Sequence, residues 1–262
     1  MSTQNSANFL DFLHLIENLK TIKRTGWINS NIPNPESIAD HMYRMGIMAM
    51  AIDDPSIDTN RAVQIAIVHD IAEAVVGDIT PYDNVSKHEK YQLELTIKRT
   101  GWINSNIPNP ESIADHMYRM GIMAMAIDDP SIDTNRAVQI AIVHDIAEAV
   151  VGDITPYDNV SKHEKYQLEL NGVQKIKQVL GNTNFSDKIE ELWLEYEQGQ
   201  TIEARLVKDL DKFEMITQAY EYEIANGVKL QSFFDSTSGV FKHPTVVLWA
   251  EELIKKRNAL FL

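Results

Sequence analysis

Apolar residues recur at helical spacing along most of this chain. In residues 8–20, one face of a helix would carry Phe9, Phe12, Leu13, Ile16 and Leu19. The same periodicity predicts helices over residues 34–52, 58–77, 86–95, 185–198, 201–225 and 243–261. The alternating pattern of a strand is scarce, so the sequence predicts an all-α fold.

Polar residues and glycine mark the predicted helix ends. Asn34 is expected to cap the helix that Pro35 opens. The next helix is expected to begin after Asp58 or Thr59 and to stop at Gly77, where a left-handed conformation is easy. A capping box is expected twice, at Ser86 with Glu89 and at Ser161 with Glu164.

An internal repeat revises the domain organisation. Residues 21–95 recur without a change as residues 96–170, at a constant offset of 75. Natural tandem domains diverge, so an identical copy indicates an engineered or very recent duplication. Removing one 75-residue copy from the 262-residue chain leaves a unit of 187 residues. We expect one domain interrupted by its own copy: residues 21–95 are copy one, residues 96–170 are copy two, and residues 171–262 complete the fold.

Composition excludes several classes of function. The net charge is −14, and each copy carries six Lys and Arg against eleven Asp and Glu, so removing one copy leaves −9. Such an acidic surface is unsuited to nucleic acid, whose phosphates require basic residues. The sequence has neither a signal peptide nor an apolar run of about 18 residues, so we expect a cytoplasmic protein without a membrane partner. Without cysteine, disulfides and thiolate metal sites are excluded.

Candidate chemistry lies in the stretch "IVHDIAEAVVGDI", residues 67–79, which recurs at residues 142–154. His69, Asp70 and Glu73 interrupt an otherwise aliphatic helix, on which His69 and Glu73 would lie one turn apart. Burying several ionisable groups is costly unless they pair or bind a cation. The preceding predicted helix adds His41, so the pattern indicates a metal site. Imidazole and carboxylate ligands favour Mn, Co, Fe, Ni or Zn over Ca or Mg.

A fourth ligand is expected from "RLVKDLDKFEMITQA", residues 205–219, which contains two aspartates. Asp211 lies four residues after Val207 on the inward stripe, so we expect it to bind the metal. Asp209 shares a face with Arg205, so we expect it to be a solvated charge.

Several further stretches carry a resemblance to a known family. They are "RTGW", "PESIADHMYRM", "IVHDIAEAVVGDITPYDN", "HEKYQ", "LWLEYE", "VKDLDKFEMITQAYEYE" and "FFDSTSGVFKHP". Together with the H…HD…D pattern, they resemble the HD domain-containing protein 2 family of 5′-deoxynucleotidases over essentially the whole 187-residue unit. The dipeptide HD alone would carry no weight, whereas the RTGW and HD…E…GDI blocks are specific.

The resemblance implies roles for individual residues. The metal ligands would be His41, His69, Asp70 and Asp211 in copy one, or His116, His144, Asp145 and Asp211 in copy two. The residues that assist catalysis would be Glu73 and Asp78, or Glu148 and Asp153. The substrate phosphate would be bound by Arg24 or Arg99, because a planar guanidinium suits phosphate. Trp27 or Trp102 fits a core position as well as a wall against the base.

The same resemblance implies a hydrolase that uses a divalent cation: Mn, Co or a similar ion, with Mg as a further candidate. Its substrates would be deoxyribonucleoside 5′-monophosphates, cleaved to deoxynucleoside and phosphate. The alternatives are a nucleotide phosphodiesterase or alarmone hydrolase of the HD type, a non-catalytic metal- or nucleotide-binding HD module, and a helical scaffold.

The duplication limits the number of complete sites. Each chain has one Asp211, so at most one four-ligand site can form per chain. Copy two is followed directly by the C-terminal half and must bring only the first helix back across the 75 residues of copy one. Copy one must instead bring the whole C-terminal half back across the 75 residues of copy two, so loop-closure entropy mildly favours copy two. The resemblance implies a homodimer, and the apolar helices of the spare copy add a domain-swapped dimer as a second expectation.

Overall fold

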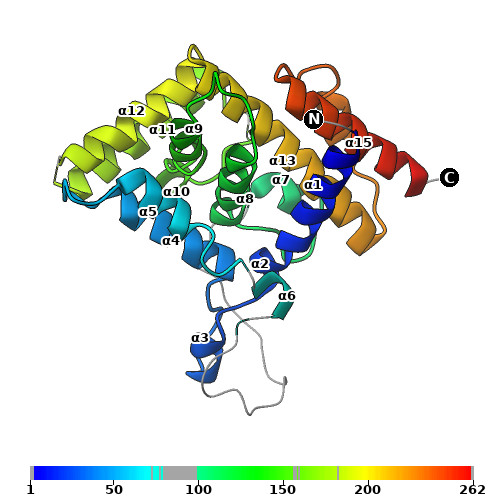
Figure 1. The fold of residues 1–262 in the computed structure, drawn as a ribbon, viewed down its shortest axis with the longest axis horizontal. Helices are drawn as coiled ribbons and strands as arrows, with labels where there is room; N and C mark the ends of the chain where they lie inside the picture. Colours follow the sequence, from blue (N-terminus) through cyan, green and yellow to red (C-terminus); the bar gives the residue numbers. More distant parts are fainter. Residues whose placement is uncertain are drawn as a thin grey trace.

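A computed structural model describes residues 3–71, 73–76, 78, 99–155, 158, 160–181 and 183–260. These residues confirm the predicted all-α fold (Figure 1). The helices are α1 (Thr3–Ile16), α2 (Asn18–Thr21), α3 (Thr25–Asn29), α4 (Ile38–Met50), α5 (Thr59–Ala66), α6 (Glu73–Val76), α7 (Thr100–Asn104), α8 (Ile113–Met125), α9 (Thr134–Ala141), α10 (Glu148–Val151), α11 (Lys162–Val179), α12 (Asn184–Gln198), α13 (Ile202–Asn226), α14 (Gln231–Ser236) and α15 (Pro244–Leu260). The described residues contain no helix that is long and apolar enough to cross a membrane.

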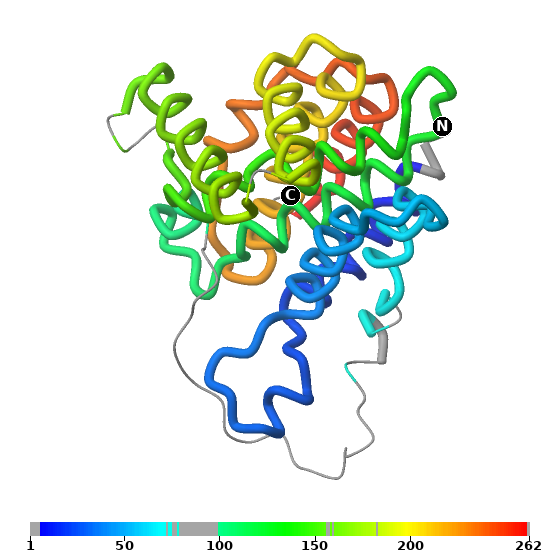
Figure 2. The backbone as a smooth tube through the Cα atoms, turned by 90° about the vertical axis from the view of Figure 1, so that its left-hand side faces the viewer, coloured from blue at the N-terminus to red at the C-terminus, as the bar shows by residue number. Residues whose placement is uncertain are grey.

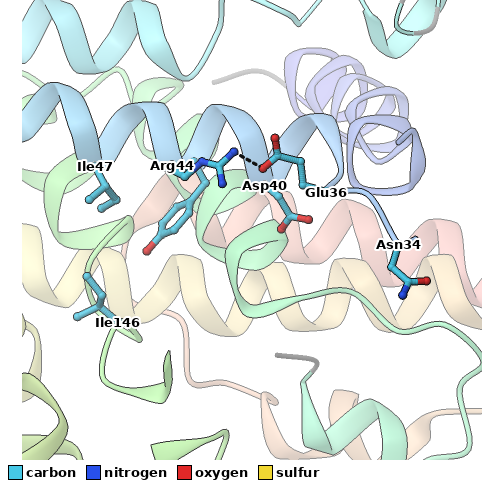
Figure 3. A pocket seen from close by; sticks show the side chains of 7 residues that line it. Asn34, Glu36, Asp40, Arg44, Ile47 and Ile146 are labelled. Carbon is cyan, nitrogen blue, oxygen red and sulfur yellow. Dashed lines mark hydrogen bonds and ion pairs between the residues drawn. The ribbon is translucent and has the colours of Figure 1, made fainter. Parts of the chain in front are cut away.

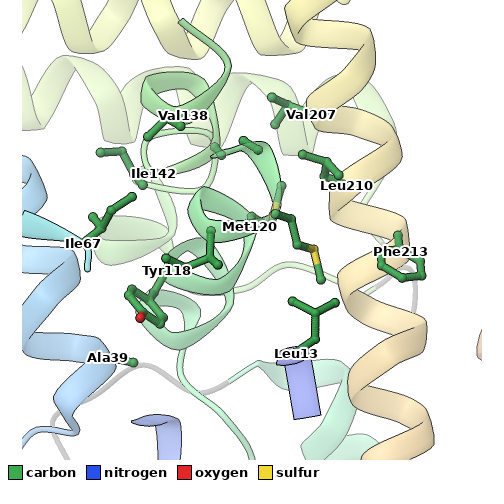
Figure 4. Close-up of a cluster of buried hydrophobic side chains, with 14 of the residues drawn as sticks. Leu13, Ala39, Ile67, Tyr118, Met120, Val138, Ile142, Val207, Leu210 and Phe213 are labelled. Carbon is green, nitrogen blue, oxygen red and sulfur yellow. The ribbon is translucent and has the colours of Figure 1, made fainter. Parts of the chain in front are cut away.

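Helix α13 is the central helix of the core. It packs against α8 and α9 of copy two and against α12 and α15 of the C-terminal region. Val207, Leu210 and Phe213 are buried on its inner face, and Figure 4 shows them beside Met120 of α8 and Leu13 of α1. Copy two is therefore the copy that the C-terminal helices complete.

The two copies fold alike locally but have different surroundings. Trp102 of α7 is 2% exposed and packs edge-on against Tyr222 and tilted against Phe233, whereas its counterpart Trp27 is 46% exposed. In Figure 2 the blue segment that holds α3 extends away from the other helices. Identical sequences thus give a core residue in one copy and a surface residue in the other, because Trp102 packs against Tyr222 of α13 and Phe233 of α14.

The predicted start of the helix in residues 34–52 is wrong by a few residues. Ser37 is the N-cap, and it forms a capping box with Asp40. Asn34 instead adopts a positive φ of 49°, in the left-handed region that asparagine tolerates. The capping box predicted at Ser161 with Glu164 is confirmed, while the one at residues 86–89 lies outside the described residues.

The prediction of one helix over residues 58–77 is also wrong. Helix α5 begins at Thr59 with Asp58 as N-cap, as expected, but it ends at Ala66. Residues 67–71 form hydrogen-bonded turns, and a short helix follows from Glu73. His69 and Asp70 therefore lie in a turn, as do His144 and Asp145 of copy two. Gly77 lies outside the described residues, but its counterpart Gly152 ends α10 with φ 78°.

Candidate metal centre

Three elements bring the candidate ligands of copy two together. His116 comes from α8, His144 and Asp145 come from the turn after α9, and Asp211 comes from α13. They meet because α8 and α9 both pack on the same face of α13. The break in the predicted helix matters here, since a turn presents two adjacent side chains toward one point more readily than a helix does.

The ligand atoms converge on one small volume. His116 Nε2 lies 3.3 Å from Asp211 Oδ1 and 3.9 Å from Asp145 Oδ2. His144 Nε2 lies 3.1 Å from Asp145 Oδ2, and the two imidazole rings are 5.5 Å apart. One atom from each of His116, His144 and Asp145 lies within 4.8 Å of the others. Two imidazoles and two carboxylates in this arrangement are a suitable donor set for a divalent ion of the first transition row.

A second layer of contacts fixes the orientation of these ligands. Glu214 Oε2 lies 2.5 Å from His116 Nδ1, and the Ala141 carbonyl lies 2.9 Å from His144 Nδ1. Tyr196 donates its hydroxyl to Asp211 Oδ2 at 3.0 Å. With both Nδ1 atoms occupied, both Nε2 atoms are buried without a hydrogen-bond partner. Buried imidazole nitrogens held in this way, beside two carboxylates, fit a bound cation.

The electrostatics of the protein without its metal reflect this crowding. Burial and Arg99 act to lower the pKa of His116, but Glu214 and Asp211 outweigh them and raise it to about 9. Burial acts to raise the pKa of Asp145, and His144 outweighs it and lowers that pKa to about 2. The protonated His116 imidazole therefore compensates the charge of Glu214 and Asp211 until a cation replaces its proton.

Glu148 and Arg99 lie at the edge of the same site. Burial, together with the charges of Asp145 and Asp153, raises the pKa of Glu148 to about 10. The Arg99 guanidinium has one buried nitrogen, Nη1, without a hydrogen-bond partner, 3.8 Å from Glu214 Oε2. A buried carboxyl that keeps its proton and an unsatisfied guanidinium nitrogen are groups suited to a phosphate ester.

Asp153 connects the RTGW loop to the site. Its carboxylate accepts the backbone N–H of Thr100 at 2.6 Å, and its carbonyl accepts the Thr100 hydroxyl at 3.0 Å. Since Thr100 follows Arg99 directly, Asp153 holds the loop that carries the arginine. Copy one repeats this link, with Thr25 N–H donating to Asp78 at 2.5 Å and Arg24 Nε 3.7 Å from Asp78.

Copy one reproduces only part of the centre. His69 Nε2 lies 3.1 Å and His41 Nε2 lies 3.8 Å from Asp70 Oδ2, close to the values in copy two. His41 Nδ1 is 4.0 Å from Glu36, whereas its counterpart in copy two is in hydrogen-bonding contact with Glu214. The Asp211 contact belongs to His116 of copy two. The burial of Glu73, along with Asp70 and Asp78, raises the Glu73 pKa to about 7.

The expectation that Asp209 is a solvated charge is wrong. Its side chain is buried, and one carboxylate oxygen accepts the backbone N–H groups of Lys242 and His243, each at 2.7 Å. Those residues precede α15, so Asp209 ties α13 to the start of that helix. Helical spacing alone placed Asp209 on a polar face, but the segment that precedes α15 covers that face.

Three buried side chains around the site are not among the residues predicted from the sequence. Glu214 supports His116, Tyr196 supports Asp211, and Lys20 pairs with Glu214 at 3.0 Å. A signal for Glu214 was present, since it lies three residues after Asp211 and thus on the same helical face. No local pattern marks Lys20, which reaches the site from α2.

Comparisons with known proteins agree with the geometry. The HD domain family matches residues 16–97 and, separately, residues 95–249. The 5′-deoxynucleotidase hdd1 of Schizosaccharomyces pombe is 50% identical over 167 residues, which cover 62% of this chain and 84% of that protein. The 5′-deoxynucleotidase HDDC2 of Dictyostelium discoideum is 50% identical over 176 residues, covering 62% of this chain and 92% of that protein. The human protein of the same name is 46% identical over 164 residues, covering 62% of this chain and 80% of that protein.

Proposed function

This chain belongs to the HD domain family, and we propose that it hydrolyses deoxyribonucleoside 5′-monophosphates at a metal centre formed by copy two. The proposal rests on one observation above the others: the Nε2 atoms of His116 and His144 are buried without a hydrogen-bond partner, 3.3 Å from Asp211 and 3.1 Å from Asp145 respectively. Relatives that bear the name 5′-deoxynucleotidase and share up to 50% identity support the reaction and the substrate class.

We propose His116, His144, Asp145 and Asp211 as the metal ligands, with Mn or Co as the preferred ion and Mg as a further candidate. When bound, such an ion would polarise the phosphoryl group and lower the pKa of a water molecule, whose deprotonated form is the nucleophile for phosphorus. Glu214 keeps the His116 ring in the orientation that points Nε2 into the site. The ligand set of copy one lacks the contact to Asp211, so we do not assign the reaction to it.

The remaining residues act on the substrate. We propose that Arg99 donates its Nη1 N–H, which has no hydrogen-bond partner, to a phosphate oxygen and offsets the charge that develops there. Glu148, whose pKa is raised to about 10 by burial and by Asp145 and Asp153, is suited to protonate the leaving 5′-oxygen. Asp153 keeps the loop of Arg99 in place through Thr100.

A direct assay tests the proposal. Phosphate release is measured from dAMP, dCMP, dUMP and dTMP with Mn²⁺, Co²⁺ or Mg²⁺, with and without a chelator. We expect release that the chelator abolishes and that is lost in Asp211→Ala. Matching ribonucleotides test the preference for deoxyribose. Cleavage of a phosphodiester in place of the monoesters would assign the chain to the phosphodiesterase alternative, and metal binding without any hydrolysis would assign it to the non-catalytic one.

The homodimer, or domain-swapped dimer, expected for this chain stays an untested prediction. We propose that a 187-residue unit without the duplication pairs with a second such unit. The small-molecule substrate is the only other partner that we propose.

A further inference from the structure

The two copies bind one another through reciprocal hydrogen bonds. The Ser37 hydroxyl of copy one donates to Asp115 Oδ1 of copy two at 2.8 Å. The Ser112 hydroxyl of copy two donates to Asp40 Oδ1 of copy one, also at 2.8 Å. Each serine is the N-cap of its own helix, and all four side chains are buried. The offset of 75 makes these two bonds the same contact, made once in each direction.

A second pair of bonds repeats the relationship at the other end of the contact. Gln64 of α5 donates to Asn135 of α9 at 2.9 Å, and Gln139 of α9 donates to Asn60 of α5 at 2.6 Å. Again each bond maps onto the other when the copies are exchanged. Reciprocity at two separate places is the property of a two-fold, isologous interface, in which one surface patch contacts itself.

The centre of the contact is apolar and closely packed. A Cβ atom added to Gly46 would lie 3.6 Å from Ile142 of the other copy, and one added to Gly121 would lie 3.5 Å from Ile67. Figure 4 shows Ile67 and Ile142 next to each other between the two copies. Both isoleucines are fully buried, so the patch has the buried apolar centre and the hydrogen-bonded edge of a specific interface.

The contact also reaches the metal centre. A cavity of about 420 Å³ lies between α4 of copy one and Ile146, the neighbour of Asp145, and Figure 3 shows Ile146 below Ile47. Tyr43 of copy one lines this cavity, and burial together with the charge of Asp145 raises its pKa. Burial together with the charge of Asp70 of copy one likewise raises the pKa of Tyr118 of copy two.

From these reciprocal contacts we infer that copy one binds copy two as one subunit of a two-fold dimer binds its partner. The patch around Ser112, Gly121 and Gln139 is a self-association surface whose partner is a second copy of the same segment. In this chain the duplicated segment fills that surface from within, so the chain is an internal pseudo-dimer and is monomeric. The inference does not depend on the reaction, because its contacts involve the helix pairs and not the metal ligands.

The test frees the surface of copy two in the full chain. Ile67→Glu places a charge in the centre of the contact, while the sequences of copy two, α13 and the C-terminal helices stay unchanged. Light scattering coupled to size exclusion is expected to give a monomer of 29.8 kDa for the unchanged chain and about twice that mass for Ile67→Glu. Adding Gln139→Lys, in the freed surface itself, is expected to return the variant to a monomer.

A second variant covers the event that Ile67→Glu aggregates. Asn60→Lys with Gln64→Lys removes the hydrogen bonds of copy one at the edge of the contact without burying a charge at its centre. It is expected to dimerise in the same way and to be reversed by Gln139→Lys. An unchanged chain that is itself a dimer, variants that stay monomeric, or a dimer that persists with Gln139→Lys would each overturn the inference.

Discussion

His116 Nδ1 and Glu214 Oε2 lie 2.5 Å apart on the buried side of the metal centre. The identical histidine of copy one, His41, has Glu36 as its nearest acidic partner on Nδ1, at 4.0 Å. The two copies therefore offer the same two histidines and aspartate with different support. A ligand substituted in one copy can therefore be compared with the same residue substituted in the other copy.

Replacing Glu214 with glutamine is expected to weaken metal binding. The amide keeps the size of the side chain but removes the charge that favours Nε2 as the ligand atom, which typically costs ~10–100-fold in affinity. Titration calorimetry with Mn²⁺ measures the change. Glu221→Gln is the control, since Glu221 is equally buried and pairs with Arg119 without contacting His116. Equal losses in both variants would contradict a specific role for Glu214.

His116→Ala and His41→Ala remove the same residue from the two copies. We expect phosphate release to fall by about 100-fold or more in His116→Ala, because a metal ligand is lost from the working centre. His41→Ala is expected to keep the activity of the unchanged chain. Steady-state rates with dAMP and Mn²⁺ give the comparison, and a loss in His41→Ala alone would place the reaction in copy one.

Asp211→Asn is expected to make the two centres more alike. In the unchanged chain, the copy two centre has the additional carboxylate of Asp211, so calorimetry should resolve it from the weaker triad of copy one by at least about tenfold. Without that charge, both centres present two imidazoles and one aspartate, so the gap between their Mn²⁺ affinities should narrow to the part that Glu214 contributes through His116. A single class of sites before the substitution would contradict this prediction.

The contact between the copies is expected to weaken as pH rises. Burial and the charge of Asp40 raise the pKa of Asp115 from 3.8 to about 7. Because the folded state keeps a proton that the unfolded chain releases, this contribution to stability is present below pH 4 and is lost as pH rises toward 7. Asp115→Asn should reduce that dependence and stabilise the chain at pH 8 by about 1–2 kcal/mol. Urea unfolding at several pH values measures it, and the exposed Asp128→Asn should leave the dependence unchanged.

Trp102 and Trp27 give a matched pair for stability. Trp102 is buried and donates its indole N–H to Glu111 at 2.9 Å, so Trp102→Ala is expected to cost about 3–5 kcal/mol. Trp27 is 46% exposed, and Trp27→Ala should change the free energy of unfolding by no more than about 0.5 kcal/mol. Comparable losses in urea unfolding would mean that copy one has its own packed core.

The sequence by itself determined the all-α class, the repeat and the chemistry of the candidate ligands. Helical periodicity is a local property, so it placed Asp211 on the inner face of α13 correctly. The same reasoning failed for Asp209, whose face is covered by the start of α15. It also failed at the turn that holds His144 and Asp145, because apolar residues continue through that turn and hide the end of the helix.

Only the tertiary structure decided which copy builds the centre. Residues 21–95 and 96–170 are identical, so every local preference is the same in both and no pattern in the sequence can rank them beyond a small loop-closure term. The difference comes from α13, which occurs once and supplies Asp211 and Glu214 to copy two. The pairing of Ser37 with Asp115 was likewise absent from the sequence pattern, since a contact between segments 78 residues apart depends on packing.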